Sequence, residues 1–221
     1  MLTRSEEDYL KAIQELCGRH GRASTSELAA RLGVAPASIT NMLQRLAAHQ
    51  PPLVNYRKHR GATLTDDGCA RALQVIRRHR LIELFLHRIL DYGWDEVHEE
   101  AERLEHVISA EMEARIAQAL GDPARDPHGE PIPTAGARMP EARGLALSDL
   151  RPGQAGVVLQ VSGAPPALLR HLESLGLLPD THVRALEYSP FDQNLRVQVE
   201  GQPQPITVGP QVAGSITVEV D

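Results

Sequence analysis

Aromatic residues make up only 3% of this 221-residue chain, and cysteine occurs only twice. Because hydrophobic residues still reach 42%, the cores must be built from aliphatic side chains. Cys17 and Cys69 lie far apart and form no C-x-x-C motif, which predicts neither a disulfide framework nor a zinc ribbon. No apolar run reaches about 18 residues, and the N-terminus lacks the apolar core of a signal peptide. We therefore expect a soluble, cytoplasmic protein with no membrane partner.

Charge is distributed unevenly along the chain. The net charge of the whole sequence is −6. Residues 1–80 contain 13 basic and 7 acidic residues and carry +6, whereas the remaining 141 residues contain 10 and 22 and carry −12. The length accommodates two or three compact modules. The first module is basic and suits nucleic acid, a preference that the overall charge conceals.

Three short helices are predicted at the N-terminus. The first covers Ser5 to Cys17, the second stops at Gly33, and the third opens at Pro36, a residue suited to a first helical turn. The tight turn between the second and third is typical of a helix-turn-helix. The outer face of the third helix carries side chains that can read base edges in the major groove: Ser38, Thr40, Asn41, Gln44 and Arg45. The alternative is an ordinary helical hairpin with a solvated face.

The following segment, L-V-N-Y-R-K-H-R-G-A-T-L-T, predicts two short strands around a basic turn. Arg57, Lys58 and Arg60 in this turn are placed to meet phosphates. The segment therefore favours a winged helix-turn-helix over about residues 1–65, and argues against the hairpin.

Histidine and glutamate recur at helical spacing further along. His98, Glu102, Glu105 and His106 fall within an arc of roughly 100° on one helix face. His79 and Glu83 form another i, i+4 pair, on a long helix that Thr65 can cap. Imidazole and carboxylate groups at these spacings suit a transition metal, although a salt-bridged solvated face is the alternative. The long helix is apolar over much of its circumference from Leu81 to Leu90, which predicts a subunit interface.

The remainder of the chain changes character. Residues 121–146 are rich in proline and glycine and are predicted to form a linker. Five short β-like runs and one short helix follow, which predicts a small barrel. The expected fold class is mainly α with a small β domain at the C-terminus. The expected domains are a winged helix-turn-helix at 1–65, a helical domain at 66–121, the linker at 122–146 and the β domain at 147–221.

With these motifs the chain resembles the diphtheria-toxin-repressor (DtxR/MntR) family of metal-dependent transcriptional regulators. The resemblance covers essentially the whole chain. It is carried by E-D-Y-L-K-A-I, V-A-P-A-S-I-T-N-M-L-Q-R-L, K-H-R-G-A-T-L-T-D-D-G and, most strongly, R-H-R-L-I-E-L-F-L with E-V-H-E-E-A-E-R-L-E-H-V-I-S. The tail, with L-E-S-L-G-L-L-P-D-T, looks like the SH3-like (FeoA-like) domain of longer members. The resemblance implies a helical metal-binding and dimerisation domain and a homodimer on double-stranded operator DNA.

The resemblance also implies two sets of metal ligands. One metal would lie between Asp8 and the later residues Glu102, Glu105 and His106, and the second site would comprise His79, Glu83 and His98. Iron-type members would show sulfur ligands at Asp8 and Glu102, so the carboxylates here favour Mn(II), with Fe(II) compatible.

Other positions mix the two types. Lys11 stands where manganese-type members tend to have a carboxylate, and the short manganese-type members usually lack a C-terminal domain. In iron-type members the tail donates ligands, for which Gln160, His171 and Glu173 are candidates here. The remaining histidines, including His49 and His128, are interpreted as surface or packing residues.

We therefore expect a DNA-binding repressor that controls metal-ion homeostasis when Mn(II) or Fe(II) is bound. The sequence contains no nucleophile motif, and we expect no enzymatic activity. Two alternatives stay open: a winged-helix regulator that responds to an organic ligand, and a carboxylate-bridged metalloenzyme.

Overall fold

The structure, a computed structural model, describes residues 2–141 and 143–220. They divide into two compact units. The first contains the chain up to His79 with Glu102–Glu113 and Pro133–Pro140. The second contains Arg80–Ala101, Ala114–Ile132 and the chain from Glu141 onward.

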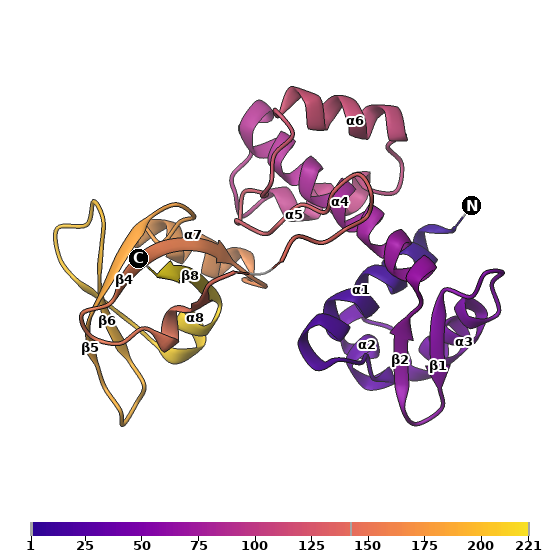
Figure 1. Cartoon of the computed structure of the whole chain (residues 1–221), viewed down its shortest axis with the longest axis horizontal. Coiled ribbons are helices and arrows are strands. Elements are labelled where there is room, and N and C mark those ends of the chain that lie inside the picture. Colours follow the sequence, from indigo (N-terminus) through magenta and orange to yellow (C-terminus); the bar gives the residue numbers. More distant parts are fainter. Residues whose placement is uncertain (1, 142, 221) are drawn as a thin grey trace. The chain divides into compact units, whose positions relative to one another are not determined.

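The helix-turn-helix forms because each helix has clear start and stop signals. The helices are α1 (Arg4–His20), α2 (Thr25–Leu32) and α3 (Pro36–Ala47), and they gather with the strands β1 and β2 (Figure 1). Thr3 and Ser24 close capping boxes at the starts of α1 and α2, and Gly21 and Gly33 end them in the left-handed conformation. Proline occupies the first turn of α3, as predicted.

The predicted wing is an antiparallel hairpin of β1 (Val54–Arg57) and β2 (Gly61–Leu64). Gly61 has a φ of 77°, and a Cβ at this position would lie 2.4 Å from the carbonyl oxygen of Ala23. Only glycine therefore allows the hairpin to lie against the segment before α2. The backbones of Ala62 in the hairpin and Ala23 in that segment exchange two hydrogen bonds. The core beneath is aliphatic, with Leu10, Ile13, Leu28, Ile39, Leu43 and Leu46 fully buried.

Three further helices follow: α4 (Asp66–Leu90), α5 (Val97–Leu104) and α6 (Ala110–Ala119). The hydroxyl of Thr65 accepts a hydrogen bond from the backbone of Gly68 and caps α4, as expected. The expectation of one helix through His106 is wrong: α5 ends at Leu104, whose carbonyl accepts the N–H of Val107 and closes a turn. Glu105 and His106 therefore lie in this turn, where their directions no longer follow helical spacing.

The described residues of the proline- and glycine-rich segment form no helix, and several side chains in its first half are buried. Asp126, His128 and Ile132 are buried, and Arg125 forms an isolated β-bridge with Pro131. Gly129, with a φ of 81°, packs so closely on the strand that carries Leu159 that a Cβ would lie 1.9 Å from the Leu159 carbonyl oxygen.

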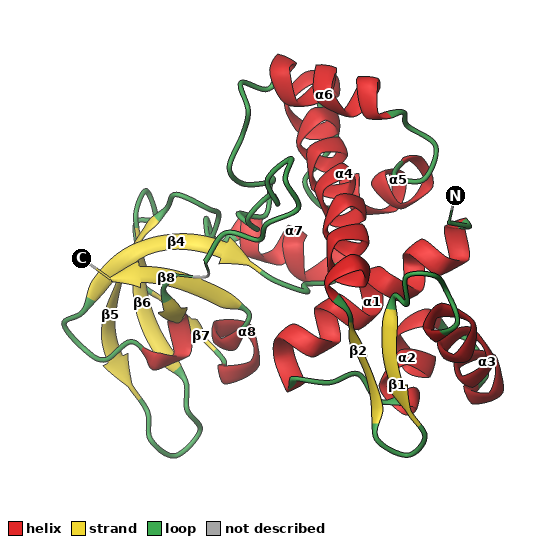
Figure 2. Cartoon of the chain, turned by 45° about the vertical axis from the view of Figure 1, so that its right-hand side comes forward, coloured by secondary structure: helices red, strands yellow, loops and turns green. Residues whose placement is uncertain are grey.

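The C-terminal region is a six-stranded antiparallel sheet in the order β3-β8-β4-β5-β6-β7 (Figure 2). Its strands are β3 (Leu145–Ala146), β4 (Ala155–Val161), β5 (His182–Tyr188), β6 (Leu195–Val199), β7 (Ile206–Val208) and β8 (Ile216–Val220). The predicted helix is α7 (Pro166–Ser174), whereas the 3₁₀ turn Leu147–Asp149, strand β3 and helix α8 (Pro210–Gly214) were not expected. Trp94, from the segment between α4 and α5, is buried in the core of this sheet.

The expected fold class, mainly helical with a small C-terminal β domain, is confirmed. None of the helices in the described part of the chain is both long and apolar enough to span a membrane.

Candidate functional site

The first cluster of ligand-type side chains lies within the first unit and joins segments far apart in sequence. Asp8 projects from α1, and Glu105 and His106 come from the turn after α5. The Nε2 atom of His106 lies 2.8 Å from Asp8 Oδ1 and 3.3 Å from Glu105 Oε1. One ligand atom from each of the three residues falls within 4.8 Å of the other two. Asp8, Glu105 and His106 are called the Asp8 cluster below.

The orientation of His106 is set by its other ring nitrogen. Its Nδ1 lies 2.6 Å from Glu7 Oε2, a carboxylate oxygen that can accept a hydrogen bond from this nitrogen. The buried Nε2 atom faces the Asp8 and Glu105 carboxylates and makes no hydrogen bond with any residue that the structure describes. An imidazole held by a carboxylate with its second nitrogen aimed at oxygen ligands is the usual arrangement of a metal-binding histidine.

Electrostatics at Asp8 also suit a cation. Burial, together with the charges of Glu102 and Glu105, raises the pKa of Asp8, although His106 acts in the opposite direction. Crowded carboxylates of this kind are relieved by a divalent ion, and oxygen and imidazole ligands are a fitting set for Mn(II) or Fe(II). The residues present therefore fit the metal that the sequence implies.

Glu102, the fourth predicted ligand of this site, is paired with Lys11. Its Oε1 accepts a hydrogen bond from Lys11 Nζ at 2.8 Å, and the same ammonium donates to both oxygens of Glu105 at 2.9 and 3.1 Å. Lys11 Nζ also lies 3.1 Å from His79 Nδ1, a nitrogen that contacts Glu105 as well. Burial lowers the pKa of Lys11, but Glu105 and Glu102 raise it by more, so the group stays charged. Lys11 thus provides this side of the site with a cation of its own.

A second buried cluster, which sequence analysis missed, lies within the second unit. It consists of Glu83 on α4 with Asp126 and His128 from the proline- and glycine-rich segment. All three are buried, and burial followed by the charges of Glu83 and Glu130 raises the pKa of Asp126 well above its usual value. Glu83, Asp126 and His128 are called the Glu83 cluster below. His128, interpreted from the sequence as an ordinary surface or packing residue, is one of its ligand-type side chains.

His128 is oriented in the same way as His106. Its Nε2 donates to the carbonyl oxygen of Trp94 at 2.7 Å, which leaves the lone pair of Nδ1 3.9 Å from Glu83 Oε2. The predicted ligand His98 contacts the other oxygen of Glu83 at 3.1 Å and is half exposed. His79 lies one helical turn before Glu83 on α4. The tail candidates His171 and Glu173 are exposed on α7, and the Gln160 amide donates to Ser162.

The predicted DNA-contacting residues lie on the surface of the first unit. Ser38, Asn41 and Gln44 are exposed on α3. The three basic residues of the wing are exposed too: Arg57, Lys58 and Arg60. Thr40 is only partly exposed, and its hydroxyl donates to the Pro36 carbonyl. Arg45 is exposed but forms an ion pair with Glu6, Nε to Oε1 3.0 Å.

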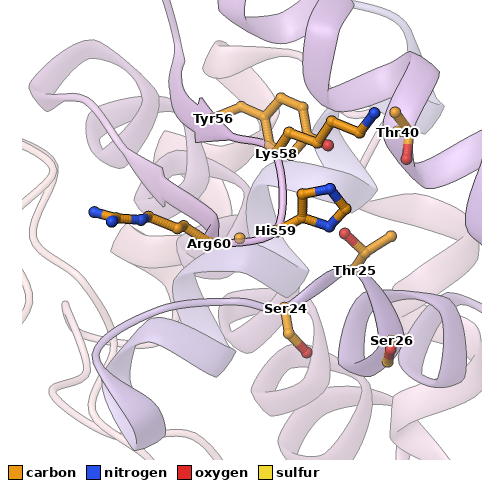
Figure 3. A pocket seen from close by; sticks show the side chains of 9 residues that line it. Ser24, Thr25, Ser26, Thr40, Tyr56, Lys58, His59 and Arg60 are labelled. Atoms are coloured by element: carbon orange, nitrogen blue, oxygen red, sulfur yellow. The ribbon is translucent and has the colours of Figure 1, made fainter.

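A surface pocket lies between the wing and the start of α2. Ser24, Thr25 and Ser26 line it from α2, Thr40 from α3, and Lys58 from the wing. In Figure 3 the Lys58 side chain extends toward Thr40, whereas Arg60 points to the opposite side. Hydroxyl and ammonium donors around one hollow are suited to hold a backbone phosphate.

Comparisons with known proteins agree over the whole chain. Family models match in three consecutive stretches: "Iron dependent repressor, N-terminal DNA binding domain" at residues 1–62, "Iron dependent repressor, metal binding and dimerisation domain" at 65–134, and "FeoA domain" at 145–220. The iron-dependent repressor IdeR of Mycobacterium leprae (strain TN) is 30% identical over 230 residues, covering 99% of this chain and 98% of its own.

Solved structures give the same result. A manganese-dependent transcriptional repressor in complex with manganese is 38% identical, with a TM-score of 0.88 over 96% of this chain and 98% of its own. ScaR with bound Cd2+ is 36% identical, with a TM-score of 0.82 over 97% and 98% of the two chains. The chain therefore belongs to the diphtheria-toxin-repressor (DtxR/MntR) family of metal-dependent transcriptional repressors.

Proposed function

We propose that this protein is a metal-activated repressor that binds double-stranded operator DNA as a homodimer and controls genes of metal-ion homeostasis. The observation that carries the proposal is the Asp8 cluster, because its ligands come from the helix-turn-helix and from the turn after α5. Asp8, Glu105 and His106 would hold a divalent ion there, which would supply positive charge to the two carboxylates. Asp8 then holds α1 to the turn that carries Glu105 and His106.

The ligand set favours Mn(II), with Fe(II) as the second candidate. Asp8, Glu105 and His106 offer hard oxygen atoms and one imidazole nitrogen, and the described part of the site contains no sulfur ligand. One relative is described as manganese-dependent and another as iron-dependent, so both metals occur within the family. Glu102, predicted as a ligand of this site, accepts a hydrogen bond from Lys11. His79, predicted as a ligand of the second site, contacts Lys11 and Glu105.

We further propose the Glu83 cluster as a second metal site, with His98 beside it. Its two carboxylates and one imidazole repeat the chemistry of the Asp8 cluster. Asp126 and His128 take the place of the tail residues Gln160, His171 and Glu173 that the sequence suggested. Arg80, whose Nε lies 3.7 Å from Asp126 Oδ2, offsets part of the negative charge.

DNA binding is supported by the exposed polar face of α3 and by the basic wing. Half-sites of an operator lie about 34 Å apart, so a dimer must present two recognition helices at a fixed separation. Dimerisation is supported by apolar side chains exposed in the region that matches the dimerisation model, among them Ile89, Leu90 and Val107. A second subunit would cover these apolar side chains.

The test uses DNA duplexes selected from a random pool with Mn(II) present. We expect Mn(II), or Fe(II) under anaerobic conditions, to raise the affinity of the wild type by roughly 5- to 150-fold. His106→Gln should abolish this gain, whereas Glu99→Gln, at an exposed position of α5, should retain it. Equal affinity of the wild type with metal and with chelator would refute the metal switch.

Two further measurements separate the alternatives. A regulator of the same fold that responds to an organic ligand would purify without stoichiometric metal, which elemental analysis detects. A metalloenzyme would lose activity on substitution of His106 without any change in DNA affinity. Membership in a family of transcriptional repressors favours a regulator without enzymatic activity.

A further inference from the structure

Glu6 is a buried carboxylate that joins α1 to the recognition helix α3. Its side chain is 2% exposed. One oxygen, Oε2, accepts the backbone N–H and the hydroxyl of Thr3 at 2.8 and 2.9 Å, which completes the capping box of α1. The other, Oε1, lies 3.0 Å from Arg45 Nε and 3.0 Å from His49 Nε2. The last turn of α3 and the residue after its cap are thus attached to the first turn of α1.

The next two residues of α1 belong to the metal site. Glu7 holds His106 through Nδ1, and Asp8 faces His106 Nε2. Successive residues of a helix are rotated by about 100°, so Glu6 and Asp8 project from nearly opposite sides of α1, about 200° apart. One helical turn therefore holds α3 on one side and the Asp8 cluster on the other.

This arrangement changes the role of Arg45. On the sequence alone it is a candidate for reading a base in the major groove. In the structure its Nε atom is committed to Glu6, although more than half of the side chain is exposed. A charge-assisted hydrogen bond to a buried carboxylate is a strong and directional contact.

We propose that Glu6 is a positioning residue, which transmits the state of the Asp8 cluster to α3, and that Arg45 serves this connection and does not read a base. The inference rests on the proposed metal-dependent DNA binding. A shift of the first turn of α1 on metal binding moves the Glu6 carboxylate, and Arg45 and His49 carry the shift into α3. Glu6, Arg45 and His49 are not members of the Asp8 cluster, so their proposed role is to position α3.

The central variant is Glu6→Gln, which keeps the size of the side chain and its bonds to Thr3 but removes the charge that holds Arg45. The matched control is Glu15→Gln, also on α1, whose carboxylate pairs with Arg31 of α2 at 2.9 Å. Mn(II) affinity is measured without DNA by calorimetry, and DNA affinity is measured with Mn(II) and with chelator.

We expect Glu6→Gln to bind Mn(II) as the wild type does, while the metal-induced gain in DNA affinity falls below about threefold from the wild-type range of about 5- to 150-fold. Glu15→Gln should retain the full gain. A full gain in Glu6→Gln would overturn the proposal. Absence of the gain in the wild type itself would instead refute the proposed function, so the two failures are distinguishable.

Arg45→Gln and His49→Gln keep the proposal testable if Glu6→Gln does not fold, because both side chains lie partly in solvent. Arg45→Gln should lose the metal-induced gain and select the same DNA sequences from a random pool as the wild type. A relaxed preference at one base pair with the gain intact would show that Arg45 reads a base. The double variant Glu6→Gln/Arg45→Gln should be no worse than either single variant, since both break one connection.

Discussion

Lys11 places a buried positive charge beside the acidic residues around the Asp8 cluster. The ammonium is buried and contacts Glu102, Glu105 and His79 at hydrogen-bonding distance. Removing one member of a buried charge group leaves the others without compensation, which is costlier than the group itself is stabilising. The resemblance placed Lys11 where manganese-type members tend to have a carboxylate, but its three contacts could not be predicted because they depend on the fold.

Substitution of Lys11 by methionine should therefore destabilise the protein when no metal is present. We expect a loss of about 3–5 kcal/mol in the free energy of unfolding, measured by urea denaturation with chelator. Mn(II) should recover more stability in this variant than in the wild type, because the carboxylates have lost their other cation. Lys58→Met, at an exposed position of the wing, is the control and should change stability little. Equal stability of wild type and Lys11→Met would contradict the assigned role.

Three residues of the sites, Glu7, Asp126 and His128, were not identified from the sequence, for physical reasons. Glu7 contacts His106, which is 99 positions away in the sequence, so no spacing within the first helix indicates this contact. His128 lies in a segment whose proline and glycine content is typical of linkers, and its burial follows from Gly129 packing on Leu159. The proline and glycine content of a segment predicts that it forms turns, but it does not predict which residues the segment packs against.

At the scale of elements, capping signals predicted most helices correctly. Thr65 and Pro36 mark the starts of α4 and α3, and Gly33 marks the end of α2. The end of α5 was placed too late, because the histidine and glutamate spacing continued in the sequence after the helix had stopped at Leu104. The wing was predicted from its basic turn, and Gly61 explains why the hairpin lies close to α2.

The wing should contribute to DNA affinity through phosphates. Lys58→Ala is expected to weaken binding to all duplexes alike and to reduce the slope of log affinity against log salt by about one unit. The measurement is fluorescence anisotropy over a range of salt concentrations. Arg184→Ala, at an exposed position of β5 in the C-terminal sheet, is the control and should leave the slope unchanged. An effect confined to one base pair would contradict a phosphate contact.

At the scale of the whole molecule, each compact unit contains its own candidate metal site. The Asp8 cluster belongs to the unit with the winged helix, and the Glu83 cluster belongs to the unit with the C-terminal sheet. The only tryptophan of the sequence, Trp94, lies beside the Glu83 cluster, with its ring centroid 5.5 Å from that of His128. Its fluorescence can therefore be used to observe that cluster separately.

Trp94 fluorescence should therefore report on the second site alone. We expect Mn(II) titration to quench the Trp94 emission in the wild type and in His106→Gln, and to leave it unchanged in His128→Gln. Bound metal, measured by elemental analysis after gel filtration, should fall by one ion per chain in either variant. Quenching that depends on His106 and persists without His128 would show that the Glu83 cluster holds no metal.

The Lys11 ammonium also bears on how the protein responds in time. In small metallo-domains such as zinc fingers the fold itself depends on the ion, so depletion unfolds the protein and exposes it to proteolysis. Here the Lys11 ammonium balances Glu102 and Glu105, so we expect the protein to fold without the metal. A cell that runs short of the ion therefore keeps its stock of regulator intact. We then expect ion dissociation to set the delay before its genes are derepressed, and repression to resume without new synthesis.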